Sequence, residues 1–121
     1  MLNPLGEKKT AALAKDIYDY LIANDLWFDC AIYFNGKRWS TYGTTGTGKS
    51  VIEEKADPHD YTGNAGDILT VIFEGPLYEA LNYSDDYTVD EELSKIFEQY
   101  GCYYAFGEAW NITAIYDERN K

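Results

Sequence analysis

The sequence contains little of the chemistry that metal sites, disulfides and membrane spans require. It has one histidine and two cysteines, Cys30 and Cys102, which stand far apart and form no CxxC pair. We therefore predict no metal site and no cofactor, and we expect both thiols to be free and buried. No apolar run approaches the length of a membrane helix. Met1–Glu7 also lacks the apolar stretch of a signal peptide, so we expect a cytoplasmic chain without membrane contact.

Basic residues are scarce. Lysine and arginine together number 10 against 21 aspartates and glutamates, and the formal net charge is -11. Between Ala56 and Ser94 there are ten acids and no base, so this segment alone carries -10. Such a charge repels nucleic acid and anionic membranes. We therefore predict a basic protein partner and no direct nucleic-acid binding; the alternative is an acidic face that only keeps the chain soluble.

Aromatic residues are abundant at 17%, with 12 tyrosines, and tyrosine suits protein interfaces. The densest acidic cluster is formed by Asp85-Asp86 and Asp90–Glu92, and Tyr83 and Tyr87 flank its two aspartates Asp85 and Asp86. Acids in the first turn of a helix oppose its dipole, which accounts for Asp90–Glu92 but not for Asp85 and Asp86. Tyrosines beside carboxylates can bind arginine and lysine, and a row of carboxylates can imitate a phosphate track. The predicted partner-binding residues are Tyr83, Asp85, Asp86, Tyr87, Asp90, Glu91 and Glu92.

Hydrophobic periodicity predicts helices and strands in an order that favours an α+β fold. The predicted helices are Lys8–Asn24, a short one from Pro76 to about Leu81, and one that begins at an N-cap Thr88 with Glu91 in a capping box and ends at Gly101. The predicted strands are Leu26–Phe34, Lys37–Tyr42, Ile68–Glu74, Cys102–Phe106 and Ala109–Tyr116.

Two predicted hairpins, at Asn35-Gly36 and around Gly107-Glu108, make the sheet mostly antiparallel. We therefore predict a single α+β domain over residues 1–121, with a sheet of about five strands (two hairpins plus a central strand). Helices are expected to pack on one sheet face. On the other face, the alternation places Trp27, Tyr33 and Tyr103, which we expect to meet solvent or a partner.

Gly43–Ser50 matches the phosphate-loop pattern G-x-x-x-x-G-K-[ST]. In a true phosphate loop, Lys49 would reach the phosphates and Ser50 would hold Mg²⁺. That loop must join a buried parallel strand to a helix, whereas here a polar hairpin strand precedes it and Asp57-Pro58 soon follows. We interpret the match as chance. His59 has no recognisable nucleophile, and no pair stands out among the acids, so we predict no catalytic residue and no enzyme.

Two runs, Glu92–Tyr104 and Ala109–Tyr116, are similar in character to small proteins of mobile elements from Gram-positive bacteria. In its size, acidity and tyrosine content, the chain resembles the small anti-CRISPR inhibitors of type II RNA-guided nucleases. The resemblance implies a stoichiometric inhibitor in a bacterial host cell. Its acidic surface would occupy the basic channels that hold guide and target. These families share no signature, so no contact residue is carried over.

Four other functions remain open from the sequence. An immunity protein that neutralises a basic toxin nuclease would need the same acidic surface, as would an antirestriction protein that imitates DNA. An enzyme would act through Lys49 or through carboxylates. The fourth is a structural or interaction protein of another kind. Among these hypotheses, inhibition of an RNA-guided nuclease is the leading prediction.

Overall fold

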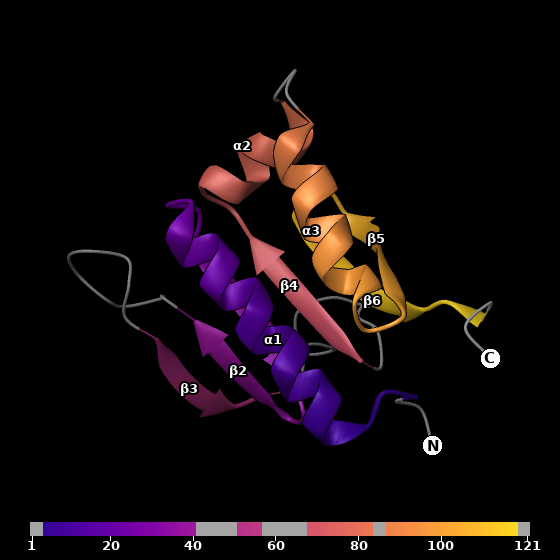
Figure 1. Cartoon of the computed structure of the whole chain (residues 1–121). Helices are drawn as coiled ribbons and strands as arrows, with labels where there is room; N and C mark the ends of the chain where they lie inside the picture. Colours follow the sequence, from indigo (N-terminus) through magenta and orange to yellow (C-terminus); the bar gives the residue numbers. More distant parts are fainter. Residues whose placement is uncertain (1–3, 41–50, 57–67, 84–86, 119–121) are drawn as a thin grey trace.

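The computed structural model describes residues 4–40, 51–56, 68–83 and 87–118 (Figure 1). Its helices are α1 (Gly6–Ala23), α2 (Pro76–Asn82) and α3 (Thr88–Glu98). Its strands are β1 (Cys30–Phe34), β2 (Lys37–Ser40), β3 (Ile52–Lys55), β4 (Leu69–Phe73), β5 (Cys102–Glu108) and β6 (Asn111–Tyr116). None of the helices in these ranges is long and apolar enough to cross a membrane.

The strands form one antiparallel sheet in the order β3-β2-β1-β4-β6-β5. The α+β class, the two hairpins and the central strand β4 are as predicted. The sixth strand, β3, was not predicted, because Ile52-Glu53-Glu54-Lys55 has no apolar alternation. Its side chains instead pair with β2: the Trp39 indole N–H donates to Glu53 at 2.7 Å, and Arg38 forms an ion pair with Glu54.

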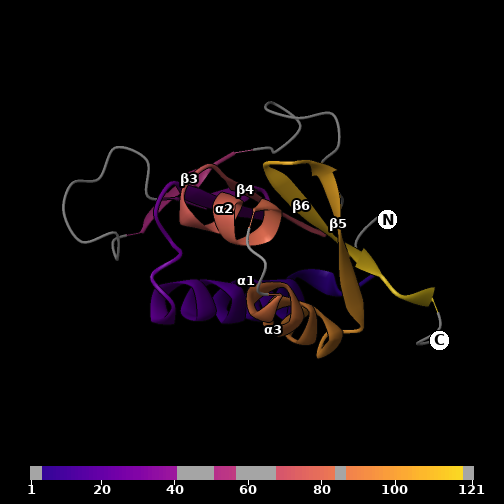
Figure 2. The ribbon, with the colours of Figure 1, turned by 90° about the horizontal axis from the view of Figure 1, so that it is seen from above.

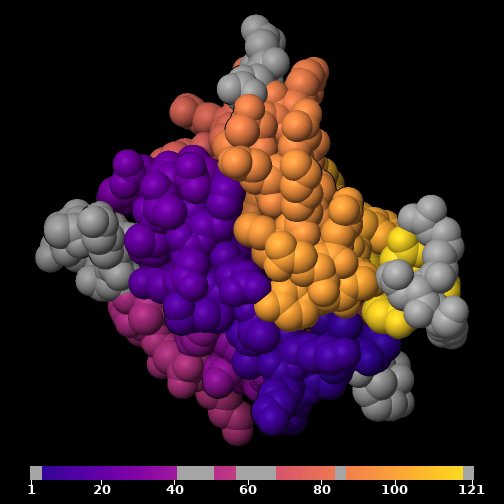
Figure 3. Space-filling view, viewed as in Figure 1, coloured from indigo at the N-terminus to yellow at the C-terminus, as the bar shows by residue number. Residues whose placement is uncertain are grey.

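Helices α1 and α3 lie beside each other over one face of the sheet, and they form the second layer of the molecule (Figures 2 and 3). Alternate residues of β1 and β4 supply the floor of this core, among them Ile32, Val71 and Phe73. The helices supply Leu13, Ile17 and Leu21 from α1 and Leu93 and Phe97 from α3. This arrangement confirms the prediction that the helices pack on one face.

The prediction for Trp27 is wrong. The strand begins at Cys30, because Asp25 and Asp29 both adopt positive φ angles of 56° and interrupt the extended chain. The strand alternation therefore does not reach Trp27. Its ring packs at 5.0 Å from the Tyr18 ring in the main core and is 1% exposed.

Tyr33 lies on the helix-free face, as predicted, but it does not meet solvent. Its side chain is 2% exposed and clusters with Ala31, Ile72 and Trp110. Tyr103 is the one of the three predicted aromatics that is exposed, at 48%. The difference follows from position in the sheet, since Tyr33 stands on an inner strand and Tyr103 on an edge strand.

The turn of the second hairpin lies later in the chain than predicted. Strand β5 continues through Gly107 with a register shift between Phe106 and Glu108, so the hairpin turns at Ala109-Trp110 and not at Gly107-Glu108. The Asn111 amide oxygen accepts the N–H groups of Gly107 and Glu108, both at 3.1 Å, and holds this bulge.

Helix α3 begins one residue earlier than expected. Its N-cap is Tyr87, whose carbonyl accepts the Glu91 N–H at 2.9 Å and whose side chain makes no cap hydrogen bond. The prediction of Thr88 as the N-cap is therefore wrong. The backbone turn of Tyr87 already accepts the first helical hydrogen bond, which places Thr88 inside the helix.

Candidate functional site

Eight of the sixteen acidic residues that the structure describes lie at one end of the molecule, where α1 finishes, β4 leads into α2 and α3 starts (Figure 1). The antiparallel pairing of β1 with β4, with Cys30 opposite Phe73, brings the start of β1 to the same end as the finish of β4. The β5–β6 turn also lies there, because the Asn82 amide in α2 donates to the Ala109 carbonyl at 2.9 Å. We call the following carboxylates the acidic end: Asp25, Asp29, Glu74, Glu79, Asp90, Glu91, Glu92 and Glu108.

Among the described residues, the acidic end contains no lysine or arginine. The described bases Lys8 and Lys9 lie at the start of α1, and Lys37 and Lys55 face each other across β2 and β3 at the opposite end. Lys15 lies in the middle of α1, Arg38 is the second residue of β2, and Lys95 lies in the second half of α3, away from its start. The charge is thus segregated along the molecule, and a segregated charge sets up a field that attracts a basic partner to one end.

Two carboxylates of the α3 start are held by tyrosines from other elements. Tyr104 of β5 donates its hydroxyl to Asp90, and Tyr20 of α1 donates to Glu92 at 2.8 Å. Burial, together with the adjacent carboxylate, raises the pKa of both tyrosines above the usual value. The two tyrosines therefore stay protonated as donors in the physiological pH range, and they tie α3 to its neighbours.

A third bond of this kind lies away from the acidic end. Tyr100, just beyond α3, donates to Asp16 of α1, and burial with this carboxylate raises the pKa of Tyr100 to about 12. The tyrosine content thus has a structural use that composition alone does not show. These tyrosines join α1, α3 and β5 through their hydroxyl groups.

Exposed aromatic side chains accompany the carboxylates. Tyr83, the C-cap of α2, is 72% exposed, and Tyr87, the N-cap of α3, is 68% exposed. Phe28 stands between Asp25 and Asp29, and Phe106 lies near the end of β5; they are exposed by 39% and 45%. Aromatic rings among carboxylates bind the stems and charges of arginine and lysine, which suits this end to a basic protein surface.

The predicted site residues fall into three groups. Tyr83, Tyr87 and Glu91 are exposed at the acidic end, as a binding role requires. Asp90 and Glu92 are also exposed, but each accepts a tyrosine hydrogen bond and so has a structural part. Asp85 and Asp86 lie outside the described residues.

The predicted site lacks seven residues of this end. Glu74 and Glu79 lie within the acidic segment Ala56–Ser94 but were not among the predicted site residues. The other five lie outside that segment in the chain, and only the fold brings them beside it: Asp25, Asp29, Glu108, Phe28 and Phe106. A signal was present for Phe28, which stands between two aspartates in the stretch Asp25–Asp29. No local signal marked Glu108 or Phe106.

The phosphate-loop match Gly43–Ser50 lies outside the described residues, as does His59. The elements on either side of the match are β2 and β3, which pair with each other as antiparallel strands. A phosphate loop uses the N-terminus of a helix directly after it, and β3 occupies that place in the chain. Within the described ranges, no group of three or more His, Cys, Asp or Glu side chains could hold a metal ion.

Both cysteines are free and buried, as predicted. The Cys30 thiol donates to the Leu26 carbonyl at 3.3 Å, and burial raises the pKa of this thiol to about 12. Burial also raises the pKa of Cys102. Neither thiol therefore has the thiolate character that a nucleophile needs.

Comparison of the chain with protein-family models, with curated proteins and with solved structures finds no match. The acidic end, with its aromatic side chains, is the candidate binding site of the described residues.

Proposed function

We propose that this protein is a stoichiometric inhibitor of a bacterial nuclease, and specifically an anti-CRISPR protein that blocks a type II RNA-guided nuclease. The observation that carries the proposal is the acidic end, where exposed carboxylates and exposed aromatic rings occur together without a described base. A soluble protein needs scattered charge, but it does not need one charge sign segregated around exposed tyrosines.

RNA-guided nucleases hold guide and target in positively charged channels that contact the nucleic-acid backbone. A compact surface of carboxylates can occupy such a channel, since its charges take the place of phosphates. Electrostatic attraction raises the association rate and selects the partner, while the aromatic rings supply the desolvated contacts that slow dissociation. The proposed contact residues are Phe28, Glu79, Tyr83, Tyr87, Glu91 and Phe106, together with Asp85 and Asp86.

The test is a DNA-cleavage assay with a purified type II RNA-guided nuclease. The protein is added before the guide RNA in one series, after the guide in a second and after target DNA in a third. We expect inhibition at stoichiometric protein, and the series that loses inhibition identifies the step that is blocked. If none of several such nucleases is inhibited, the proposal is wrong. Capture of a basic toxin nuclease would then favour an immunity protein, and capture of a restriction enzyme would favour a DNA mimic.

A pair of variants separates the acidic end from net charge. In the first, Glu79→Lys is combined with Glu91→Lys; in the control, Glu7→Lys is combined with Glu98→Lys. All four side chains are exposed, and both pairs change the net charge equally, but Glu7 and Glu98 lie at the far ends of α1 and α3. We expect the first pair to weaken inhibition by roughly a hundredfold and the control to retain it.

Asp90 and Glu92 are left intact in this design, because each accepts a hydrogen bond from a tyrosine and its substitution would change folding stability as well as binding. Added salt provides a second readout: inhibition by the native chain should weaken as ionic strength rises. Equal loss in both variant pairs, or inhibition that does not change with salt, would show that the acidic end is not the contact surface.

A further inference from the structure

Strand β5 (Cys102–Glu108) forms one edge of the sheet and pairs, among the described strands, only with β6 (Figure 2). It is the longest of the described strands, at 7 residues, and contains no lysine, arginine or proline. Proteins usually protect an edge of this kind with such residues, because its outward N–H and C=O groups can pair with another chain. The opposite edge, β3, carries Glu53, Glu54 and Lys55 and is protected in this way.

Side chains on both faces of β5 would contact a chain laid along this edge. Tyr103, on the helix-free face, is 48% exposed, and Phe106, on the helix face, is 45% exposed. The Phe106 ring packs at 6.2 Å from Tyr104, which in turn is bonded to Asp90. The edge is therefore continuous with the acidic end through these two side chains.

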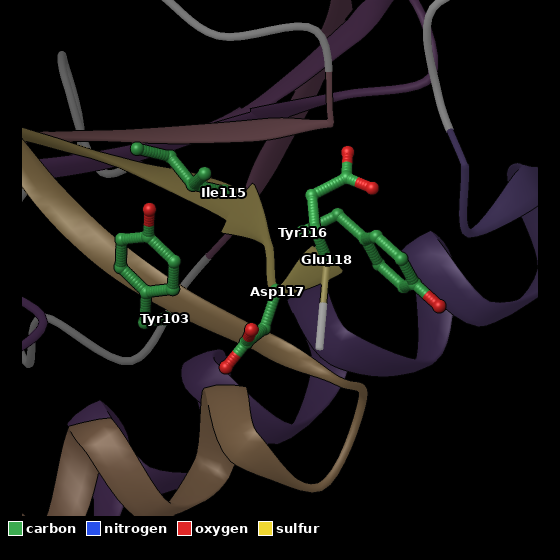
Figure 4. A pocket seen from close by; sticks show the side chains of 5 residues that line it. All are labelled: Tyr103, Ile115, Tyr116, Asp117 and Glu118. Atoms are coloured by element: carbon green, nitrogen blue, oxygen red, sulfur yellow. The ribbon is translucent and has the colours of Figure 1, made fainter. Parts of the chain in front are cut away.

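A cavity of about 560 Å³ opens beside the first half of β5. It is lined by Tyr103, Ile115, Tyr116, Asp117 and Glu118 (Figure 4). The Tyr103 ring and Ile115 come from directly paired positions of β5 and β6, and the two carboxylates come from the segment after β6. This lining suits a long basic side chain, whose stem can lie on the tyrosine ring while its charge faces the carboxylates.

We infer that the β5 edge binds an extended, basic segment of a protein partner as a seventh strand. The charge of the occupant follows from the net charge of -11 and from the carboxylates at both ends of β5. A second copy of this chain would bring equal negative charges together and is disfavoured for the same reason. The inference rests on the proposed function only in taking the partner to be basic.

The test measures amide hydrogen exchange by NMR on protein uniformly labelled with nitrogen-15. The ligand is a synthetic peptide of about ten residues that alternates lysine and valine and is long enough to span the strand. In the free protein, alternate β5 amides should exchange rapidly with solvent, since they face outward. We expect the peptide to slow exchange at these amides by roughly tenfold or more. A peptide alternating glutamate and valine should have no effect. A lysine–valine peptide whose backbone nitrogens are all methylated has the same charge and should not protect these amides, because methyl groups directed at β5 keep the two backbones too far apart to pair.

Tyr103→Lys places a positive charge on the edge, which repels the lysines of the peptide, and it should weaken binding of the lysine–valine peptide by about tenfold. Ala12→Lys, an equal change of charge at an exposed position of α1, should leave its affinity unchanged. Equal protection by the N-methylated peptide would overturn strand addition, as would protection at α3 instead of β5. So would dimers in sedimentation that protect β5 without any peptide, because they would make the occupant a second copy.

The peptide experiment needs no nuclease. If nuclease inhibition fails but β5 is protected, the proposed function is lost and the binding edge remains. If inhibition succeeds while neither the peptide nor the nuclease protects β5, the edge is lost and the proposed function remains.

Discussion

The hydrogen bond from Tyr104 to Asp90 makes the geometry of the acidic end testable through stability. Replacing Tyr104 by Phe removes the hydroxyl and keeps the ring, which packs at 5.3 Å from Phe97 and at 6.2 Å from Phe106. The lost bond has a charged acceptor, and such bonds contribute about 1.5–3 kcal/mol when they are well buried. Because Asp90 is exposed and water can replace the hydroxyl, we expect a loss of only about 1 kcal/mol.

For a chain of this length, about 1 kcal/mol corresponds to a decrease in Tm of roughly 3–5 °C. Urea denaturation monitored by circular dichroism at pH 7 measures the change in the free energy of unfolding. A double-mutant cycle with Asp90→Ala isolates the pair, and its coupling energy should account for most of the loss. Tyr103→Phe is the matched control: it is the adjacent tyrosine, it is exposed, and its hydroxyl has no partner among the described residues, so its effect should be under about 0.5 kcal/mol.

The same bond predicts a dependence on alkaline pH. Since the pKa of Tyr104 is raised in the folded protein, the folded state holds its proton more strongly than the unfolded chain does. The contribution is therefore complete below about pH 10 and decreases as the pH rises above that value. Between pH 9 and pH 11, the free energy of unfolding of the Tyr104→Phe variant should decrease less than that of the native chain. A coupling energy of zero, or parallel pH profiles of the two proteins, would refute this account of the α3 start.

The remaining predictions concern buried groups and the phosphate-loop match. Cys30 and Cys102 should not react with a thiol reagent at pH 8 in the native protein, and both should react in guanidinium; rapid labelling of the native chain would contradict their burial. Gly75→Ala should destabilise the fold by about 1–3 kcal/mol in urea, because its Cβ would stand 2.7 Å from the Phe28 carbonyl oxygen; an unchanged midpoint would show that this close approach relaxes at no cost. Lys49→Ala should leave nuclease inhibition unchanged in the cleavage assay, since we interpret the phosphate-loop match as chance; loss of inhibition would reopen the question of a nucleotide site.

The helices and most strands could be predicted because their signals are local. The apolar run in Ile68–Glu74 and the Asn35-Gly36 turn needed only neighbouring residues, and the structure has both elements at these places. Strand β3 was not predicted, because its formation does not depend on a local signal. Its residues carry no strand signal of their own, and it forms because β2 offers an open edge and matching partners in Arg38 and Trp39.

The candidate site could likewise be predicted only in part. The excess of acid, its concentration in Ala56–Ser94 and the tyrosines beside it were visible in the sequence, since charge and composition do not depend on folding. The partners of Asp90 and Glu92 were not visible. Tyr104 and Tyr20 reach these carboxylates only because α1, α3 and β5 pack together.

By itself, the sequence determined the class of fold and the sign of the charge, because both follow from composition and short-range periodicity. Only the tertiary structure decided which aromatic side chains are exposed: Trp27 is buried, whereas Tyr103 is exposed. It also added Asp25, Asp29 and Glu108 to the acidic end and left β5 as an edge. The physical reason is the same in each case: exposure and proximity depend on which elements pack against one another, and residues distant in the chain set that packing.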